Sequence, residues 1–117
     1  AAFNAEANGL TGWTTERLDW NHQTVEGVFD HVLLADVTYA VSHFEPILRH
    51  LDQCLGPSGV AWLCDPFRDV STEFLARAGS SGFAVTEAEF DTGVDSERVR
   101  LRLAQLRRAS PRDARDP

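Results

Sequence analysis

The sequence has no lysine, no methionine, only two cysteines in 117 residues and no apolar run long enough to cross a bilayer. A transmembrane helix needs about 20 consecutive apolar residues, so we expect no membrane partner. Two cysteines are too few for a disulfide scaffold, and eight glycines are too few for a collagen-like repeat. Because residues 1–10 carry no basic segment followed by an apolar one, no signal peptide is visible, and we expect a cytoplasmic protein.

The charge is acidic and unevenly distributed. The formal net charge is −7, yet residues 98–117 hold seven arginines and two aspartates. An acidic body disfavours binding to a phosphate backbone, so we expect no nucleic-acid partner. The Arg-rich end is interpreted as a solvated strand face followed by an unstructured tail over residues 107–117, although contact with nucleic acid is the alternative. With 43% hydrophobic and 25% charged residues, the rest is typical of one soluble globular domain or part of one.

The residues that most often bind metals show no metal-binding spacing. Cys54 and Cys64 are ten residues apart in apolar surroundings, which is not a zinc pattern, and we expect both to be buried reduced thiols. The four histidines form no HxxxH or HExxH pattern. We therefore expect no metal site.

Helical and strand patterns alternate along the chain, which predicts an α/β protein. A capping box of Ser42 and Glu45 predicts a helix that Gly56 and Pro57 end, with an apolar stripe on one side. Short apolar runs predict strands that are covered on both faces. The predicted elements are a helix end at 1–7, strands at 14–18, 29–35, 60–64 and 83–90, helices at 42–55 and from 69 or 71 to about 79, and a last strand from 98 to 103.

The last predicted strand alternates apolar and basic residues. Val99, Leu101 and Leu103 alternate with arginines, which predicts a strand with its arginines on a wet face. Few residues separate it from the strand at 83–90, so the two should pair antiparallel.

This order predicts a partial Rossmann-like, doubly wound α/β sheet that is mostly parallel and ends in an antiparallel strand pair. The opening βαβ unit of such a sheet is missing, so we expect residues 1–106 to be the C-terminal portion of a larger domain.

Three of the predicted strands end in polar or aromatic residues. The segments are LDW at 18–20, ADVTY at 35–39 and DPFR at 65–68. Ligands of open α/β sheets bind beyond the carboxyl ends of the strands. We therefore expect Trp20, Asp36 and Asp65 to meet at one shared crevice.

These segments, in this order, resemble the later half of a class I, seven-stranded S-adenosylmethionine-dependent methyltransferase. The most similar group is the lysine-methyltransferase-like methyltransferase family 16, in which Asp-x-x-Tyr/Phe follows the fourth strand and matches DVTY at 36–39. The resemblance covers nearly all of residues 1–106 and implies S-adenosylmethionine as cofactor. It places Trp20 against the adenine ring, Asp19 near the adenine amino group and Ala35 along the cofactor.

The same resemblance implies the residues that carry the reaction. Asp36 would face the methyl group and position an incoming amine, and Tyr39 would wall the substrate channel. Asp65 and Arg68 would border the substrate, which is a protein lysine or another amine. Simpler interpretations stay open for each residue: Asp36 as a cap and Tyr39 as a packing residue, Asp65 as a turn residue, and Arg68 as the partner of a nearby aspartate. Trp20 would then be a core aromatic.

Two other functions are compared with the features of this chain. The chain lacks the Gly-rich turn and the second-strand acid of class I enzymes, so we expect it to bind the cofactor weakly by itself and to be inactive alone. A noncatalytic, partner-binding remnant of the same fold is therefore the alternative function. A nucleotide-dependent oxidoreductase is disfavoured because no GxGxxG is present. The sequence leaves the oligomeric state open.

Overall fold

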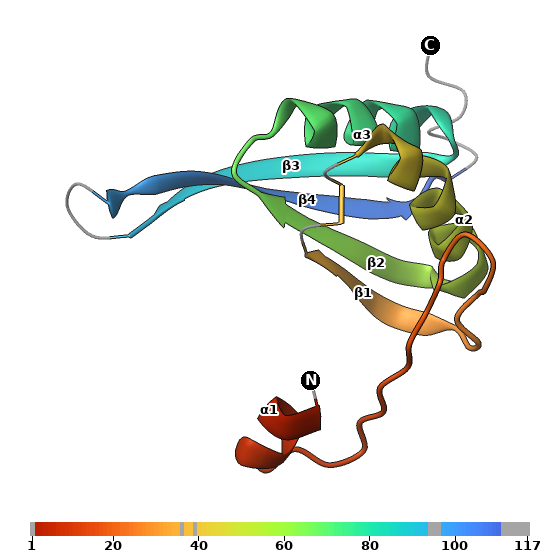
Figure 1. Cartoon of the computed structure of the whole chain (residues 1–117). Helices are drawn as coiled ribbons and strands as arrows, with labels where there is room; N and C mark the ends of the chain where they lie inside the picture. The colour runs from red at the N-terminus through yellow and green to blue at the C-terminus, as the bar shows by residue number, and fades with distance from the viewer. Residues whose placement is uncertain (1, 36, 39, 94–96, 111–117) are drawn as a thin grey trace.

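The computed structural model describes residues 2–35, 37–38, 40–93 and 97–110 (Figure 1). Its strands form one sheet, and two longer helices lie beside it. The elements are α1 (Ala2–Ala7), β1 (Phe29–Ala35), the 3-10 turn η1 (Val41–His43), α2 (Phe44–Cys54), β2 (Leu55–Asp65), α3 (Asp69–Ser80), β3 (Phe83–Thr92) and β4 (Val99–Arg108).

The sheet has the strand order β1-β2-β4-β3. β1 and β2 are parallel, whereas β4 is antiparallel to both β2 and β3. This mixed arrangement confirms a partial Rossmann-like α/β sheet and the antiparallel pair at its end. The described sheet contains one parallel pair and two antiparallel pairs, so it is less parallel than the sequence predicts.

The core lies between the sheet and the two helices on one of its faces. Phe44 and Leu51 of α2 expose 0% and 1% of their surface, and Phe74 of α3 exposes 0%. The rings of Phe44 and Phe74 meet edge to face with centroids 5.3 Å apart. The predicted apolar face of the helix at 42–55 is therefore confirmed as part of the core, and α3 contributes a second buried face.

The boundaries of α2 differ from those predicted. Ser42 lies in η1, and His43 is the residue before the helix and makes no side-chain cap bond, so the predicted capping box is wrong. At the other end the helix stops at Cys54, and Gly56 and Pro57 already belong to β2. The strand passes close to β1 here, since a Cβ on Gly59 would lie 2.9 Å from the carbonyl oxygen of Phe29.

The predicted strand at 14–18 is wrong. This segment belongs to an extended arm that runs from α1 toward β1 (Figure 1). None of the described strands pairs with it, and a strand needs a neighbour for its backbone hydrogen bonds. The helix at the start is confirmed; it ends at Ala7, and Gly9, whose φ is +66°, follows in the left-handed conformation that is common after a helix.

The sheet is covered on one face only, which corrects the prediction of cover on both. α2 and α3 lie on the same side, and no described helix lies against the other (Figure 1). Residues of this open face include Leu33 of β1, which exposes 78% of its surface, and Phe90 of β3, which exposes 42%. The register of β2 and β4 places Leu103 opposite the exposed Cys64 on the same face. The name open face is kept for this uncovered side of the sheet, which carries Leu33, Cys64, Phe90 and Leu103.

The two faces of β4 are exchanged relative to the prediction, which placed the arginines on the solvent side. Its leucines at 101 and 103 lie on the open face, while Arg102 points toward the helices beside Ala104 and exposes only 3% of its surface. The predicted wet arginine face is therefore wrong at Arg102, because a buried carboxylate pairs with it. β4 also continues through Arg107 and Arg108, the first residues of the predicted tail, and residues 111–117 lie outside the described part of the chain.

The two cysteines differ in their surroundings. Cys54 is buried at the end of α2, as predicted, and burial raises the pKa of its thiol. Cys64 lies exposed on the open face, so its predicted burial is wrong. Both are free thiols. None of the described helices is long and apolar enough to span a bilayer.

Candidate functional site

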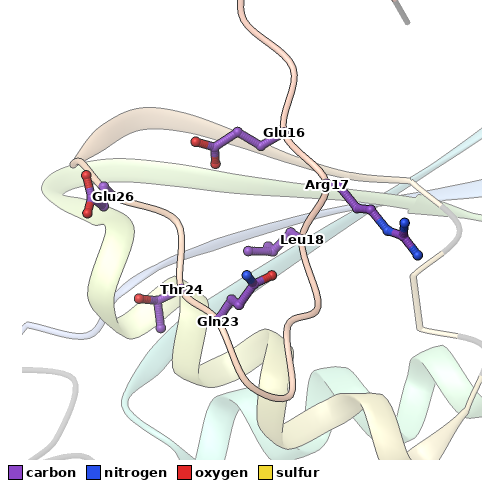
Figure 2. Close-up of a pocket in the computed structure, with 6 residues that line it drawn as sticks. All are labelled: Glu16, Arg17, Leu18, Gln23, Thr24 and Glu26. Carbon is purple, nitrogen blue, oxygen red and sulfur yellow. The ribbon is translucent and has the colours of Figure 1, made fainter.

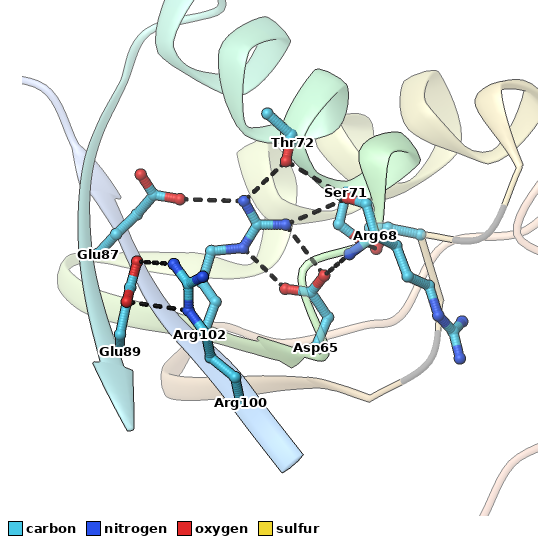
Figure 3. A network of polar contacts seen from close by, with 9 residues as sticks. Asp65, Arg68, Ser71, Thr72, Glu87, Glu89, Arg100 and Arg102 are labelled. Carbon is cyan, nitrogen blue, oxygen red and sulfur yellow. Dashed lines mark hydrogen bonds and ion pairs between the residues drawn. The ribbon is translucent and has the colours of Figure 1, made fainter. Parts of the chain in front are cut away.

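Arg102 connects the sheet to the loop that follows β2 (Figure 3). Its Nε and Nη2 donate to the two carboxylate oxygens of Asp65 at 2.8 and 2.9 Å. Its Nη1 donates to Thr72 Oγ1 at 2.9 Å and to Glu87 Oε1 at 3.3 Å, and Nη2 also donates to the carbonyl of Arg68 at 3.3 Å. A guanidinium carries five N–H groups, so every donor of Arg102 has an acceptor.

Asp65 is the other half of this buried pair. It is the last residue of β2, exposes 5% of its surface and also accepts the Arg68 amide at 2.8 Å. Burial acts to raise the pKa of Asp65, but hydrogen bonds from Arg102, the Arg68 amide and Ser71 outweigh it, so this pKa lies below its usual value. The bond to Asp65 also raises the pKa of Arg102. The pair is therefore fully charged at neutral pH.

The loop between β2 and α3 holds one strained residue. Phe67 has φ +59°, and it is the only described residue other than glycine with a positive φ. Its ring lies under two arginines, with guanidinium carbons 4.4 Å (Arg100) and 5.0 Å (Arg102) from the centroid. Such a backbone conformation costs about 1–3 kcal/mol and persists only where its surroundings impose it.

A second contact joins this loop to the one that follows β1. Thr38 Oγ1 and Ser71 Oγ are 2.7 Å apart, and these residues expose 5% and 1% of their surfaces. Ser71 lies in the first turn of α3, and its hydroxyl also acts to lower the pKa of Asp65. The carboxyl ends of the parallel strands β1 and β2 are thus linked by side chains, as the α/β topology predicts for a ligand-binding edge. Asp36 and Tyr39 lie outside the described residues.

Trp20 lies at the wall of an apolar hollow of about 270 Å³ between the arm, β1 and α2, which Val37 and His50 also line. It is half-buried, its ring is 5.2 Å from that of His43, and its carbonyl accepts a hydrogen bond from Arg49. In the same wall, His50 Nε2 is buried without a hydrogen-bond partner among the described residues. An aromatic wall with one available polar atom suits a flat heterocycle.

The neighbouring predicted cofactor residues are more exposed. Asp19 Oδ2 lies 2.9 Å from Nδ1 of His22, and its Oδ1 accepts the amide of Asn21 at 3.2 Å. The bond to His22 is the main reason that the pKa of Asp19 is lowered. Ala35, the last residue of β1, is exposed and pairs in register with Cys64.

A second hollow, of about 390 Å³, lies within the arm itself (Figure 2). Its wall is polar and comes from one bend of the chain. It is lined by Glu16, Arg17, Leu18, Gln23, Thr24 and Glu26. None of the predicted site residues lines it. Within the part of the chain that the structure describes, no group of three histidines, cysteines or acids is placed to hold a metal ion.

The predicted site residues therefore fall into two groups. Trp20 belongs to the apolar hollow, whereas Asp65 and Arg68 belong to the polar loop next to α3, and Asp65 lines neither hollow. The contacts of Trp20, Asp65 and Arg68 with a ligand stay predictions. Sequence reasoning missed Arg102 and Ser71, because one looks like part of an exposed arginine row and the other like an ordinary helix residue.

Three solved structures, two of them of methyltransferases by name, share this Rossmann-like fold. A precorrin-6y C5,15-methyltransferase from Geobacter metallireducens GS-15 matches with TM-score 0.54 and 19% identity, over 68% of this chain and 44% of that one. A precorrin 8w decarboxylase from Methanobacterium thermoautotrophicum matches with TM-score 0.63 and 16% identity, over 90% of this chain and 61% of that one. A putative methyltransferase from Thermoplasma acidophilum matches with TM-score 0.58 and 12% identity, over 93% of this chain and 54% of that one. The chain thus spans 44–61% of the length of these proteins.

A comparison with protein families gives the assignment. The family described as lysine methyltransferase, methyltransferase family 16, matches residues 3–80, which is two thirds of the chain. The chain belongs to this family. No curated protein matches it.

Proposed function

We propose that this chain forms part of an S-adenosylmethionine-dependent methyltransferase that methylates an amine nitrogen, with a protein lysine as the first candidate. The family match over residues 3–80 carries the proposal, because it spans all three segments expected at the strand ends. The link between the loops after β1 and β2 supports it, since both polar ends then belong to one edge of the sheet.

Bound S-adenosylmethionine supplies an electrophilic methyl group on a sulfonium. The chain has to hold its flat ring, for which Trp20 offers an aromatic face, His50 Nε2 a buried polar atom and Asp19 a carboxylate that can accept from an amino group. By the family resemblance, Ala35 at the end of β1 would lie along the cofactor. These features support a site for the adenosine end of the cofactor near Trp20.

The reaction itself is an in-line displacement by a neutral amine, so the protein must align the nitrogen and exclude water. We assign the alignment to Asp36, whose carboxylate would accept a hydrogen bond from the amine and favour its developing positive charge. Tyr39 would close the channel. Arg68 would border the substrate, and Asp65 would act on this side through the position of the loop.

The test uses the longest protein encoded by the gene and a labelled methyl donor, with peptide pools and small-amine pools offered separately. We expect the label on amine nitrogens. If the peptide pool contains the substrate, the label should be recovered as methylated lysine. Asp36→Asn should reduce transfer at least tenfold while leaving the dissociation constant of the donor within about twofold. Donor binding without transfer to either pool would refute the proposal. If Asp36→Asn weakened donor binding as much as it reduced methyl transfer, Asp36 would belong to the cofactor site instead.

The open face favours one second candidate, a noncatalytic module that binds a partner through an apolar sheet surface. Leu33 and Phe90 expose 78% and 42% of their surfaces there, and large exposed apolar patches mark interaction sites. In this case the same protein would bind a partner but transfer no methyl group.

A further inference from the structure

We infer that Arg102 is a positioning residue for methyl transfer, because its guanidinium bonds both the loop after β2 and the first turn of α3, and this turn bonds the loop after β1. The inference rests on the proposed function. The path goes from Arg102 to Asp65 and to Thr72, and from Ser71, the neighbour of Thr72 in α3, to Thr38. Arg102, Asp65, Ser71 and Thr38 expose 5% or less of their surfaces, so water does not compete for the Arg102–Asp65 and Ser71–Thr38 bonds.

The first effect of Arg102 is on the backbone of Arg68. The Arg68 amide donates to Asp65 Oδ2 at 2.8 Å, and its carbonyl accepts from Arg102 Nη2 at 3.3 Å and from the Thr72 amide at 3.1 Å. Both polar groups of this peptide segment are thus fixed by the same ion pair and the start of α3. The Arg68 side chain extends away from Arg102 from this anchored point (Figure 3).

The strained neighbour of Arg68 indicates that this loop shape is imposed. Phe67 holds a positive φ, and Arg100 and Arg102 lie 4.4 and 5.0 Å from its ring. A loop that only had to connect β2 with α3 would relax to an ordinary conformation. The ion pair and the ring contact together hold it in the strained one.

The second effect is on the loop after β1. Thr38 lies between the two residues predicted to be catalytic, Asp36 and Tyr39, and its hydroxyl bonds to Ser71 at 2.7 Å. Ser71 is followed by Thr72, whose hydroxyl accepts a hydrogen bond from Arg102 at 2.9 Å, so Arg102 holds the turn of α3 that carries Ser71. A displacement of about 1 Å at reacting groups can lower a rate by about 10²-fold. A change at Arg102 should therefore shift the loop after β1 and lower the rate of methyl transfer, although Arg102 itself touches no substrate.

Stability alone does not explain this arrangement. Well-packed apolar residues often stabilise a core as much as a buried ion pair does. The adjacent inward positions of β4 are in fact apolar, with Ala104 and Leu106 fully buried. Yet the Arg102 side chain directs three of its five bonds to the single segment 65–68, which the family resemblance predicts to border the substrate.

The test compares two arginines of the same strand. Arg102→Lys keeps the charge but loses the planar fork that bonds Asp65, Thr72 and Arg68 together. Arg108→Lys is the matched control, since Arg108 bonds the end of α2 at the Leu55 carbonyl, far along β4 from the loop. We expect Arg102→Lys to lower kcat at least tenfold with the KM of the donor within twofold, whereas Arg108→Lys should lower Tm without changing kcat.

Two further measurements guard against a folding defect. Ser71→Ala removes one hydroxyl of the path and should lower kcat in the same direction with a small change in Tm. Amide hydrogen exchange should speed up at least tenfold at Arg68 in Arg102→Lys and stay unchanged there in Arg108→Lys. Unchanged kcat in Arg102→Lys, or equal effects of the two lysine variants, would overturn the inference alone, whereas a wild-type protein without any transfer would refute the proposed function and the inference with it.

Discussion

Replacing Arg102 by methionine would leave the Asp65 carboxylate buried without its cation. The side chain that is lost makes two bonds to Asp65, at 2.8 and 2.9 Å, and hydrogen bonds to charged groups contribute about 1.5–3 kcal/mol each. Breaking a buried ion pair on one side costs about 3–5 kcal/mol. We therefore expect the free energy of unfolding of Arg102→Met to fall by about 3–5 kcal/mol.

The neighbouring Arg100 gives a matched control on the same strand. It forms an ion pair with Glu89 at 2.6 Å, but the two side chains expose 62% and 56% of their surfaces. Because Arg100 is largely exposed to water in both its ion pair and its contact with the Phe67 ring, Arg100→Met should cost clearly less than Arg102→Met. Adding Asp65→Asn to Arg102→Met should recover part of the loss, because no charge is then left buried.

Urea unfolding followed by tryptophan fluorescence measures these differences in the chain itself, which has three tryptophans. A loss below about 1 kcal/mol for Arg102→Met would show that Asp65 reaches water. Equal losses at Arg102 and Arg100 would show that burial of the pair is not what matters. Either result would refute the reasoning.

Two other predictions concern titration and thiol reactivity. Because the pKa of Asp65 is lowered by folding, its contribution to stability is present above the unfolded-state pKa of about 3.9 and is lost as the pH falls through the folded-state value. Urea unfolding between pH 6 and 3 should show this loss, and Asp65→Asn should flatten it; parallel curves would contradict the account. A thiol reagent should modify exposed Cys64 rapidly and buried Cys54 only after unfolding, as peptide mapping can check; rapid modification of both would show that α2 opens readily.

The parts of the fold that sequence predicted well are those that a local pattern specifies. The run at 29–35 is a strand, and the apolar stripe with Phe44 and Leu51 is a helix face, because each pattern extends over several residues of one element. The segment at 14–18 has strand-like composition but no neighbour to pair with. Pairing is a property of two segments, so composition alone gave the wrong result.

The same reason explains what was missed at the site. An alternation of leucine and arginine gives the period of β4 correctly, but it does not say which side faces the helices. That side is decided by Asp65, which is 37 residues away and accepts two bonds from Arg102. The sequence pattern and the family resemblance could predict that Trp20 lies at a hollow. The bond between Thr38 and Ser71 could not be predicted in this way, because it joins residues that only the fold brings together.

The open face has a consequence for handling the protein. The chain exposes 8383 Å² at 13.0 kDa, about 2,000 Å² more than the scaling for a folded monomer of this mass gives, and the arm and the uncovered sheet both contribute. Contact between apolar surfaces strengthens on warming from the cold and in sulfate or phosphate salts. Cold, dilute preparations without such salts should therefore stay monodisperse, while ammonium sulfate should precipitate this chain at unusually low concentration.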